Sequence, residues 1–256
     1  MNIKLMDTLK KNGFIFFRIN RDIKLIINKI NKIIINYKKK NKINFEKIKS
    51  DDLSKHTFIL QNKVNKILSP KKFFEINRKT FKHVFKEEKY SVQTYFYLRI
   101  TQPHKNNPKY KPINFHRETF QGPAFFKHIM NIWIPIKNCE KSNSIKYIKG
   151  SHLFKKLIDF NFKIRKTNVK KGSVENKIGL LYKDRKIEFR NKVQELRLFK
   201  KNNFILFYGD LIHGSAKNTT NRTRFSIDLR FMIKKNMKYN PIQGVTKKKY
   251  FKIVRL

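Results

Sequence analysis

The stretch NFHRETF, residues 114–120, contains two side chains that can bind a metal ion, His116 and Glu118, placed two positions apart. In an extended segment, side chains at i and i+2 point to the same face, so both can reach one ion. His213 follows an apolar run far downstream, in YGDLIHGSAKN, and is the best third ligand. Two imidazoles and one carboxylate, with open positions opposite them, form the facial triad of non-haem iron(II) oxygenases.

A second pair of side chains, Arg224 and Ser226 in RTRFSID, shares one face of a predicted strand after His213. A guanidinium group gives a carboxylate two parallel charge-assisted hydrogen bonds, and a serine hydroxyl gives a third. A dicarboxylic keto acid therefore fits here, with its keto-carboxylate end on the metal and its far carboxylate on this pair. His152 in KGSH is the rival third ligand, but its position in a turn predicts a structural hydrogen bond instead.

The order of several motifs resembles that of the phytanoyl-CoA dioxygenase-like family of Fe(II)/2-oxoglutarate oxygenases. The resemblance covers most of the chain, from residue 8 to about residue 231. It lies in the segments LKKNGFIFF, FHRE, NIWIPI, IKYIKGSH and YGDLIHGSAKNTTNRTRFSIDLRF.

The resemblance implies a role for each matching residue. In that family a His-x-Asp/Glu pair and a distal histidine bind iron, which implies this role for His116, Glu118 and His213. The arginine after the distal histidine binds 2-oxoglutarate, which implies this role for Arg224. Trp133 matches a strand tryptophan close to the co-substrate. Glu118 stands where the family usually has Asp, yet it remains an oxygen ligand and argues against halogenating variants, which lack the carboxylate.

The implied cofactors are Fe(II), 2-oxoglutarate as co-substrate and O2. The implied reaction is hydroxylation of a small-molecule metabolite with release of succinate and CO2. A fainter likeness of FHRETFQG and NIWIPI to streptomycin-biosynthesis oxygenases indicates a sugar or aminocyclitol derivative as substrate. Two alternatives stay open: a cupin-like binding protein without turnover, and a basic nucleic-acid-binding module. The loops 101–115 and 153–192 are predicted to set selectivity, and the sequence does not define the oligomeric state.

The first third of the chain, residues 1–89, is predicted to be mostly helical. One early strand is expected at 14–19, where FIFFRI is rich in β-forming residues. Isoleucines at helical spacing follow Asp22, which we predict to be an N-cap. Two more helices are predicted, at 53–68 and 71–85.

From residue 90 onward, short β-branched and aromatic runs alternate with polar loops. The predicted strands are 91–100, 126–136, 144–150, 193–200, 203–210 and 223–233. Helices followed by strands predict an α+β fold with an antiparallel sandwich or barrel. The resemblance implies a double-stranded β-helix, which is a cupin-like jelly roll, with the N-terminal helices packed on one sheet. We expect a single domain, 1–256, made of a helical N-terminal segment (1–89), the jelly-roll core (90–235) and a C-terminal tail (236–256).

The predicted strand 91–100 places Gln93, Tyr95 and Arg99 on one face. If that face lines the barrel, Gln93 and Tyr95 are candidate co-substrate ligands, and Arg99 is a candidate contact to co-substrate or substrate. The alternative is core packing for the aromatic residues and a surface position for Arg99, because the register is not known. Arg230 is predicted to be a surface or structural residue.

The composition is strongly basic, with a formal net charge of +45 on 256 residues. Most of this charge is lysine, accompanied by excess Asn, Ile and Phe, which indicates A/T-rich codon bias and a solvated surface rather than a specific nucleic-acid partner. Cys139 is the only cysteine, which excludes an intramolecular disulfide and favours a reducing compartment. No apolar run approaches the ~20 residues of a membrane span and no signal peptide is recognisable, so we expect the cytoplasm.

Overall fold

The computed structural model describes residues 2–87, 89–106, 115–118, 129–153, 162–167, 184–189, 195–233 and 251–255. Large stretches of the loops predicted to set selectivity, 101–115 and 153–192, lie outside these residues, as do the first three residues of the predicted strand 126–136. Within the described residues, no helix combines the length and the apolar character needed to cross a membrane.

The helices come first and partly follow the predictions. They are α1 (Asn2–Asn12), α2 (Arg21–Lys40), α3 (Ser50–Ile67), α4 (Pro70–Ile76) and α5 (Arg78–Phe85), with β1 (Phe14–Arg18) between α1 and α2. The predicted helix 71–85 is two helices, because the chain turns at Asn77. The side chain of Asn77 donates to the Phe73 carbonyl at 2.8 Å and so competes with the helical pattern.

The N-cap of α2 is Asn20, not Asp22 as predicted. The side-chain oxygen of Asn20 accepts a hydrogen bond from the backbone N–H of Ile23 at 2.9 Å. Asp22 lies in the first turn, where its charge is favourable next to the helix dipole. The sequence Asn-Arg-Asp offers two good capping residues two positions apart, and the structure uses the first.

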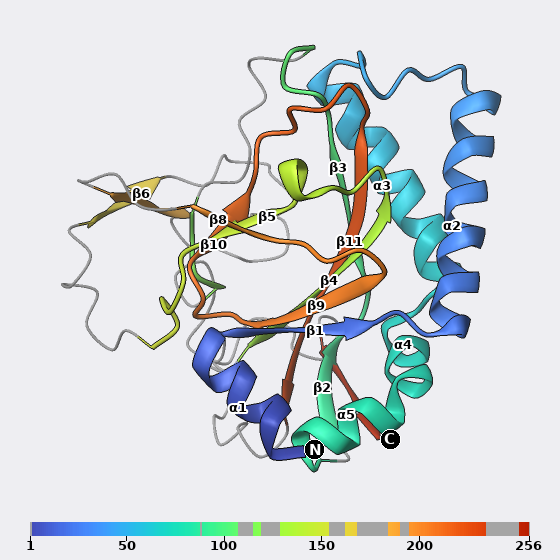
Figure 1. The fold of residues 1–256 in the computed structure, drawn as a ribbon. Coiled ribbons are helices and arrows are strands. Elements are labelled where there is room, and N and C mark those ends of the chain that lie inside the picture. Colours follow the sequence, from blue (N-terminus) through green and yellow to red (C-terminus); the bar gives the residue numbers. More distant parts are fainter. Residues whose placement is uncertain are drawn as a thin grey trace, which may run out of the picture.

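All strand pairs are antiparallel and form two main sheets (Figure 1). The large sheet has the order β1-β9-β4-β11-β2-β12, with β3 also beside β11. Its other strands are β2 (Lys89–Gln93), β3 (Tyr97–Thr101), β4 (Met130–Lys137), β9 (Asn203–Tyr208), β11 (Arg224–Ile233) and β12 (Phe251–Arg255). The small sheet has the order β10-β5-β8, made of β10 (His213–Ser215), β5 (Ile145–Tyr147) and β8 (Leu196–Leu198). The pair β6 (Phe162–Thr167) and β7 (Asp184–Phe189) forms a separate ribbon.

This arrangement confirms the predicted α+β jelly roll, with the helices on the outer face of the large sheet (Figure 1). Two strands of the large sheet lie outside the range 90–235 predicted for the jelly-roll core. They are β1 at the N-terminal side and β12, which lies in the segment predicted as a tail. A strand of five residues among lysines carries little periodicity, which is why β12 was not predicted from the sequence.

The predicted strand 91–100 is broken into β2 and β3, which share one edge of β11. Val92 pairs with Phe231, and Leu98 pairs with Ile227. The chain therefore takes six residue steps from Val92 to Leu98, whereas β11 takes four from Phe231 to Ile227. The extra residues form a bend at residues 94–96. A bend of this kind re-aims the side chains within it, so one strand face cannot be extended through it.

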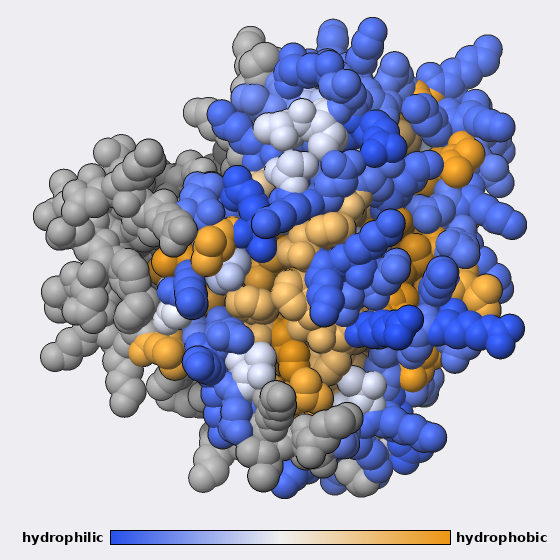
Figure 2. All heavy atoms as spheres, in the orientation of Figure 1, coloured by the Kyte–Doolittle hydropathy of each residue, from blue (hydrophilic) through white to orange (hydrophobic). Residues whose placement is uncertain are grey.

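The two faces of the large sheet have different neighbours, because side chains alternate along each strand. One face packs against the helices and forms the larger core, to which β4, β9 and β11 contribute Ile132, Ile134, Phe204, Leu206, Ile227 and Leu229. The other face turns toward the small sheet and includes Trp133, Ile205 and Phe207. Figure 2 shows apolar side chains exposed between polar ones on the viewed face of the molecule. The candidate site lies on the second face of the sheet.

Candidate metal centre and active site

His116 and His213 are brought together by the backbone itself. The N–H of His116 donates to the His213 carbonyl at 2.9 Å, and the N–H of His213 donates to the His116 carbonyl at 3.0 Å. This is an isolated antiparallel bridge at the edge of β10. Residues directly opposite each other in an antiparallel pair present their side chains on the same side. The two imidazole rings accordingly lie 4.3 Å apart between centroids.

Glu118 is fixed beside this bridge by a close approach of the backbone. Its N–H donates to the Gly209 carbonyl at 2.9 Å, and the N–H of Gly209 donates to the Ile129 carbonyl at 2.8 Å. A Cβ atom on Gly209 would lie 2.8 Å from the Ile129 carbonyl oxygen and 3.1 Å from Glu118 Cβ. Glycine at this position therefore allows Glu118 to sit against the strand.

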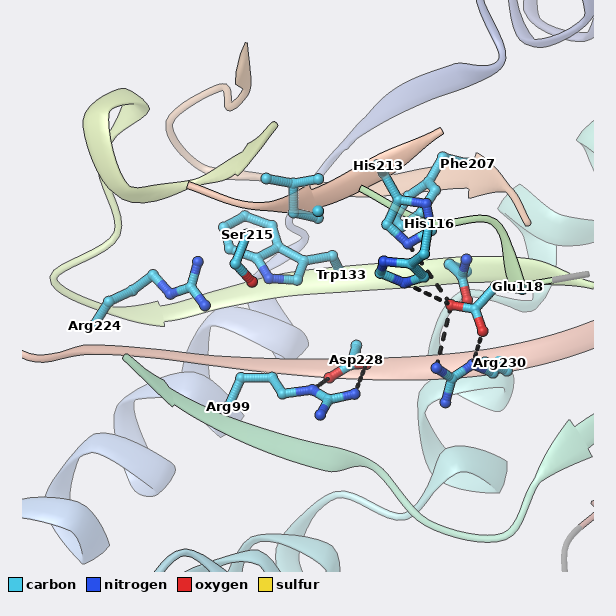
Figure 3. Close-up of a pocket in the computed structure, with 13 residues that line it drawn as sticks. Arg99, His116, Glu118, Trp133, Phe207, His213, Ser215, Arg224, Asp228 and Arg230 are labelled. Atoms are coloured by element: carbon cyan, nitrogen blue, oxygen red, sulfur yellow. Dashed lines mark hydrogen bonds and ion pairs between the residues drawn. The ribbon is translucent and has the colours of Figure 1, made fainter. Parts of the chain in front are cut away.

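The side chains of the three predicted ligands converge. His116, Glu118 and His213 are all buried, and their ligand atoms lie within 4.8 Å of one another. Glu118 Oε1 is 3.7 Å from His213 Nε2 and 4.0 Å from His116 Nε2. Figure 3 shows the three side chains pointing toward a common space.

The second nitrogen of His213 fixes the tautomer of its neutral, metal-binding form. Nδ1 lies 2.7 Å from the Leu211 carbonyl oxygen. A carbonyl only accepts hydrogen bonds, so Nδ1 carries a proton, and in the neutral ring Nε2 then presents its lone pair to the cluster. A backbone carbonyl in this position is a common partner of metal-binding histidines.

Arg230, predicted to be a surface or structural residue, forms a bidentate pair with Glu118. Its Nε donates to Glu118 Oε2 at 2.8 Å and its Nη2 donates to Oε1 at 3.2 Å. Burial alone would raise the pKa of Glu118, but Arg230 and the two histidines outweigh it and hold this pKa well below the usual range. Glu118 is therefore an ionised carboxylate whose two oxygens both accept from Arg230, while Oε1 also faces the two histidines.

The sequence contained a signal for Arg230 that the prediction did not use. Arg224 and Ser226 were placed on one face of a strand by their spacing. Two more steps of the same alternation reach Asp228 and Arg230. The structure confirms this pattern, since Arg224, Asp228 and Arg230 all line one pocket from β11.

The pocket next to the three ligands combines an apolar wall with charged pairs. Its described lining residues are Arg99, His116, Glu118, Asn131, Trp133, Ile145, Phe207, His213, Gly214, Ser215, Arg224, Asp228 and Arg230. Arg99 from β3 forms a second bidentate pair, with Asp228, at 2.9 and 3.0 Å. Burial lowers the pKa of Arg99, but the Asp228 carboxylate outweighs it and the net direction is upward.

Arg224 lies at the end of the pocket away from the ligands (Figure 3). It is 2% exposed, and its guanidinium donates to the Asn143 carbonyl at 2.7 Å and to Thr101 Oγ1 at 2.6 Å. The guanidinium carbon lies 5.9 Å from the centroid of the Trp133 ring. Arg224 and Trp133 therefore lie near each other in the pocket.

Three other predicted co-substrate ligands do not line this pocket among the described residues. Ser226 is fully buried on the same face of β11, and its hydroxyl has no hydrogen-bond partner among those residues. Gln93 accepts a hydrogen bond from the backbone N–H of Arg230 at 3.1 Å, which ties β2 to β11. Tyr95 lies in the bend and donates to the Tyr97 hydroxyl at 3.0 Å. The break of the predicted strand 91–100 explains the positions of Gln93 and Tyr95.

His152, the rival third ligand, is a structural residue, as its turn context predicted. Its Nε2 lies 2.7 Å from the Lys10 carbonyl oxygen, and its ring stacks on Tyr208 at 5.7 Å. It also packs on Gly13, where a Cβ atom would come within 2.5 Å of the His152 ring. His152 therefore fixes α1 to the sheet.

The donor set fits a divalent first-row metal such as iron. Metal–ligand bonds of ~2.0–2.2 Å require the ligand atoms to lie a few ångströms apart, and the three side chains meet that condition. A metal held by two imidazoles and one carboxylate would keep positions open for a co-substrate, and all three side chains line the pocket. Arg224 at the far end suits an anionic group of a molecule that also reaches the metal.

Comparisons with known proteins agree with this geometry. The profile of the family described as Phytanoyl-CoA dioxygenase (PhyH) matches residues 21–226. No curated protein sequence matches the chain.

Several solved structures share the fold. One is AviO1 from Streptomyces viridochromogenes Tue57, with a TM-score of 0.52 and 12% identity over 94% of this chain and 97% of that one. Another is the epimerase SnoN in complex with Fe3+, alpha ketoglutarate and nogalamycin RO, with a TM-score of 0.54 and 9% identity over 97% and 96%. EvdO2 from Micromonospora carbonacea var. aurantiaca has a TM-score of 0.51 and 11% identity over 91% of both chains.

Proposed function

Because the chain belongs to the phytanoyl-CoA dioxygenase family, we propose that it is an Fe(II)- and 2-oxoglutarate-dependent oxygenase that hydroxylates a small-molecule metabolite. The observation that carries the proposal is the convergence of His116, Glu118 and His213 within 4.8 Å. These residues hold the iron. When bound, iron and 2-oxoglutarate supply the oxidising chemistry, in which O2 converts 2-oxoglutarate to succinate and CO2 and places one oxygen atom on the substrate.

The remaining side chains orient the reactants. Arg224 receives the far carboxylate of 2-oxoglutarate, with its own position set by the Asn143 carbonyl and the Thr101 hydroxyl. Ser226 remains the predicted hydroxyl donor to the same carboxylate. Trp133 lies beside this path and excludes water from it.

Arg230 acts as a positioning residue for the carboxylate ligand. Glu is one methylene longer than the Asp usual in the family, so its carboxylate has one more free torsion. The bidentate pair with Arg230 removes that freedom, and it leaves Oε1 directed to the two histidines. The longer ligand is thus compatible with the same metal position.

The proposed substrate class rests on the resemblance to streptomycin-biosynthesis oxygenases. A polar metabolite of the sugar or aminocyclitol type is the substrate that we propose, and the solved complex of SnoN with nogalamycin RO supports a small-molecule ligand in this fold. The cytoplasm remains the proposed location, since the single Cys139 needs no oxidising compartment.

Succinate formation tests the proposed activity. Pure protein is incubated with Fe(II), 2-oxoglutarate and air, alone and with candidate metabolites, and succinate is measured by NMR. We expect succinate from the wild type and none from His116→Ala. Metal and 2-oxoglutarate binding without any succinate would support the alternative of a binding protein without turnover. Absence of both kinds of binding in the wild type would overturn the enzyme proposal.

A pair of arginine variants tests the co-substrate site. Arg224→Lys is expected to weaken 2-oxoglutarate binding to the Mn(II)-loaded protein about 10–100-fold, because a lysine cannot make two parallel bonds to a carboxylate. Arg222→Lys is the matched control, since Arg222 is two positions away, exposed, and paired with Glu140 at 2.9 Å. Equal affinities in the two variants, measured by calorimetry without O2, would remove Arg224 from the co-substrate site.

A further inference from the structure

The positive and negative charges on the described lining residues of the pocket do not balance. Its described lining residues include three arginines, Arg99, Arg224 and Arg230, against two carboxylates, Glu118 and Asp228. The two histidines are neutral when they bind a metal. On the proposed function, a divalent ion and a dianionic 2-oxoglutarate enter the same pocket, and their charges cancel. One positive charge therefore remains in excess after both have bound.

Arg99 is the arginine that remains available to a substrate. Arg230 pairs with the ligand Glu118, and Arg224 lies at the far end of the pocket (Figure 3). Arg99 uses Nε and Nη2 for Asp228, which leaves its Nη1 group outside this pair. The Arg99 side chain is 35% exposed, compared with 20% for Asp228 and 14% for Arg230. Among the charged side chains of the described pocket lining, Arg99 is therefore the most accessible from solvent.

The pocket that Arg99 lines contains further hydrogen-bond donors. Arg99 and Arg230 both lie against the ring of Tyr97, with guanidinium carbons 5.0 and 5.5 Å from its centroid. Asn131 lines the same pocket, is 4% exposed, and its Nδ2 has no hydrogen-bond partner among the described residues. It lies opposite Arg230 in the register of β4 and β11. A buried amide donor without a partner requires an acceptor from a ligand or water.

The geometry points to a substrate that carries an oxyanion, either a carboxylate or a phosphate, which Arg99 binds at the exposed edge of the pocket. An oxyanion supplies both the missing negative charge and the acceptor atoms. A cationic aminocyclitol would add to the positive excess, and a neutral sugar would leave it uncompensated in a partly buried site. Among the polar metabolites proposed above, the acidic and phosphorylated ones are therefore the substrate class.

Inorganic phosphate is the probe that tests this inference. The protein is saturated with Mn(II) and 2-oxoglutarate without O2, and phosphate binding is followed by 31P NMR. Paramagnetic relaxation by Mn(II) reports only phosphate close to the metal, so binding to the lysine-rich surface does not contribute. Acetate is added as a carboxylate competitor and glucosamine as a cationic one. We expect acetate to displace phosphate and glucosamine to have no effect.

Three variants assign the binding to Arg99. Arg99→Gln is expected to weaken phosphate binding about tenfold. Arg222→Gln, which removes an exposed arginine on the same chain, is expected to leave it unchanged. Asp228→Asn is expected to strengthen phosphate binding, because it releases Arg99 and makes the pocket more positive. Unchanged circular dichroism spectra and one Mn(II) bound per chain in each variant show that the fold and the metal centre are intact.

Two results would overturn the inference. One is equal phosphate relaxation in Arg99→Gln and Arg222→Gln, which would place the anion elsewhere. The other is displacement by glucosamine but not by acetate. Phosphate and acetate binding is also measured by calorimetry in the absence of Mn(II) and 2-oxoglutarate. This measurement tests the inference independently of the proposed function, because the excess positive charge is present in that state too. Loss of Mn(II) binding with retained anion preference would refute only the oxygenase proposal.

Discussion

The two faces of the large sheet are built from the same strands, yet they differ in almost every physical respect. On β11, Ile227 and Leu229 point into the core beneath the helices. Asp228, which lies between them in the sequence, and Arg230, which follows Leu229, point into the pocket. The helices extend this apolar core with packed aromatic rings. The ring centroids of Phe74 and Phe81, for example, lie 4.5 Å apart. The polar face holds two bidentate ion pairs side by side.

The apolar face stabilises the fold, and the polar face carries the proposed function. Burial of apolar area is the dominant favourable term in folding. The attraction within a buried ion pair often does not offset the cost of removing both charges from water. Such pairs therefore often contribute less to stability than apolar residues of the same volume. Two such pairs next to three convergent ligands are therefore better explained by what they position than by the stability they add.

The largest loss of stability is expected when an aromatic residue of the core at the apolar face is truncated. Phe74→Ala is expected to lower the free energy of unfolding by about 3–5 kcal/mol, because Phe74 is fully buried and packs on Phe81 and Phe231. Urea denaturation followed by circular dichroism measures this loss. Phe58→Ala, at a position 64% exposed, is the control and should change stability by less than about 0.5 kcal/mol. Equal losses in the two variants would contradict the assigned core.

A smaller effect, limited to the metal centre, is expected on the polar face. Arg230→Gln should weaken Mn(II) binding about 10–100-fold, because Glu118 loses the partner that fixes its carboxylate. Arg99→Gln is the matched control, since Arg99 pairs with Asp228, which is not a ligand. Mn(II) EPR spectra should change shape in the first variant only, and Arg230→Lys should recover some of the affinity. Unchanged or tighter Mn(II) binding in Arg230→Gln would show that Arg230 competes with the metal instead.

The smallest effect is expected at the start of α2, remote from the site. Asn20→Ala should cost about 1 kcal/mol of stability, because the hydrogen bond to Ile23 N is lost. Asp22→Ala should cost less, since its interaction with the helix dipole is screened by salt. Thermal unfolding at high salt separates the two residues. A larger loss for Asp22→Ala under those conditions would restore Asp22 as the N-cap.

The sequence was sufficient to single out His116, Glu118 and His213 as candidate metal ligands because their types and spacing are specific. His116 and Glu118 lie two positions apart, and His213 follows a strong apolar strand. Alternation along the predicted strand 223–233 would have placed Arg230 in the site. Its bidentate partner, however, lies on another segment of the chain, and that pairing depends on the long-range register of β11.

Other features depend on structure that a periodic pattern does not contain. The bend between β2 and β3 inserts residues into one edge of β11, which moves Tyr95 away from the predicted face. The turn at Asn77 depends on one side-chain hydrogen bond to Phe73. The strand β12 is defined by its pairing with β2 and not by its own sequence. In each case a long-range or side-chain contact decides the outcome.

Titration with Mn(II) tests the central claim most directly. The claim is that His116, Glu118 and His213 bind one divalent ion, and the high positive charge of the chain keeps non-specific cation binding low. Calorimetry should show one Mn(II) per wild-type chain, loss of tight binding in His213→Ala, and wild-type binding in the control His152→Ala. Wild-type affinity in His213→Ala, or loss of binding in His152→Ala alone, would contradict the account.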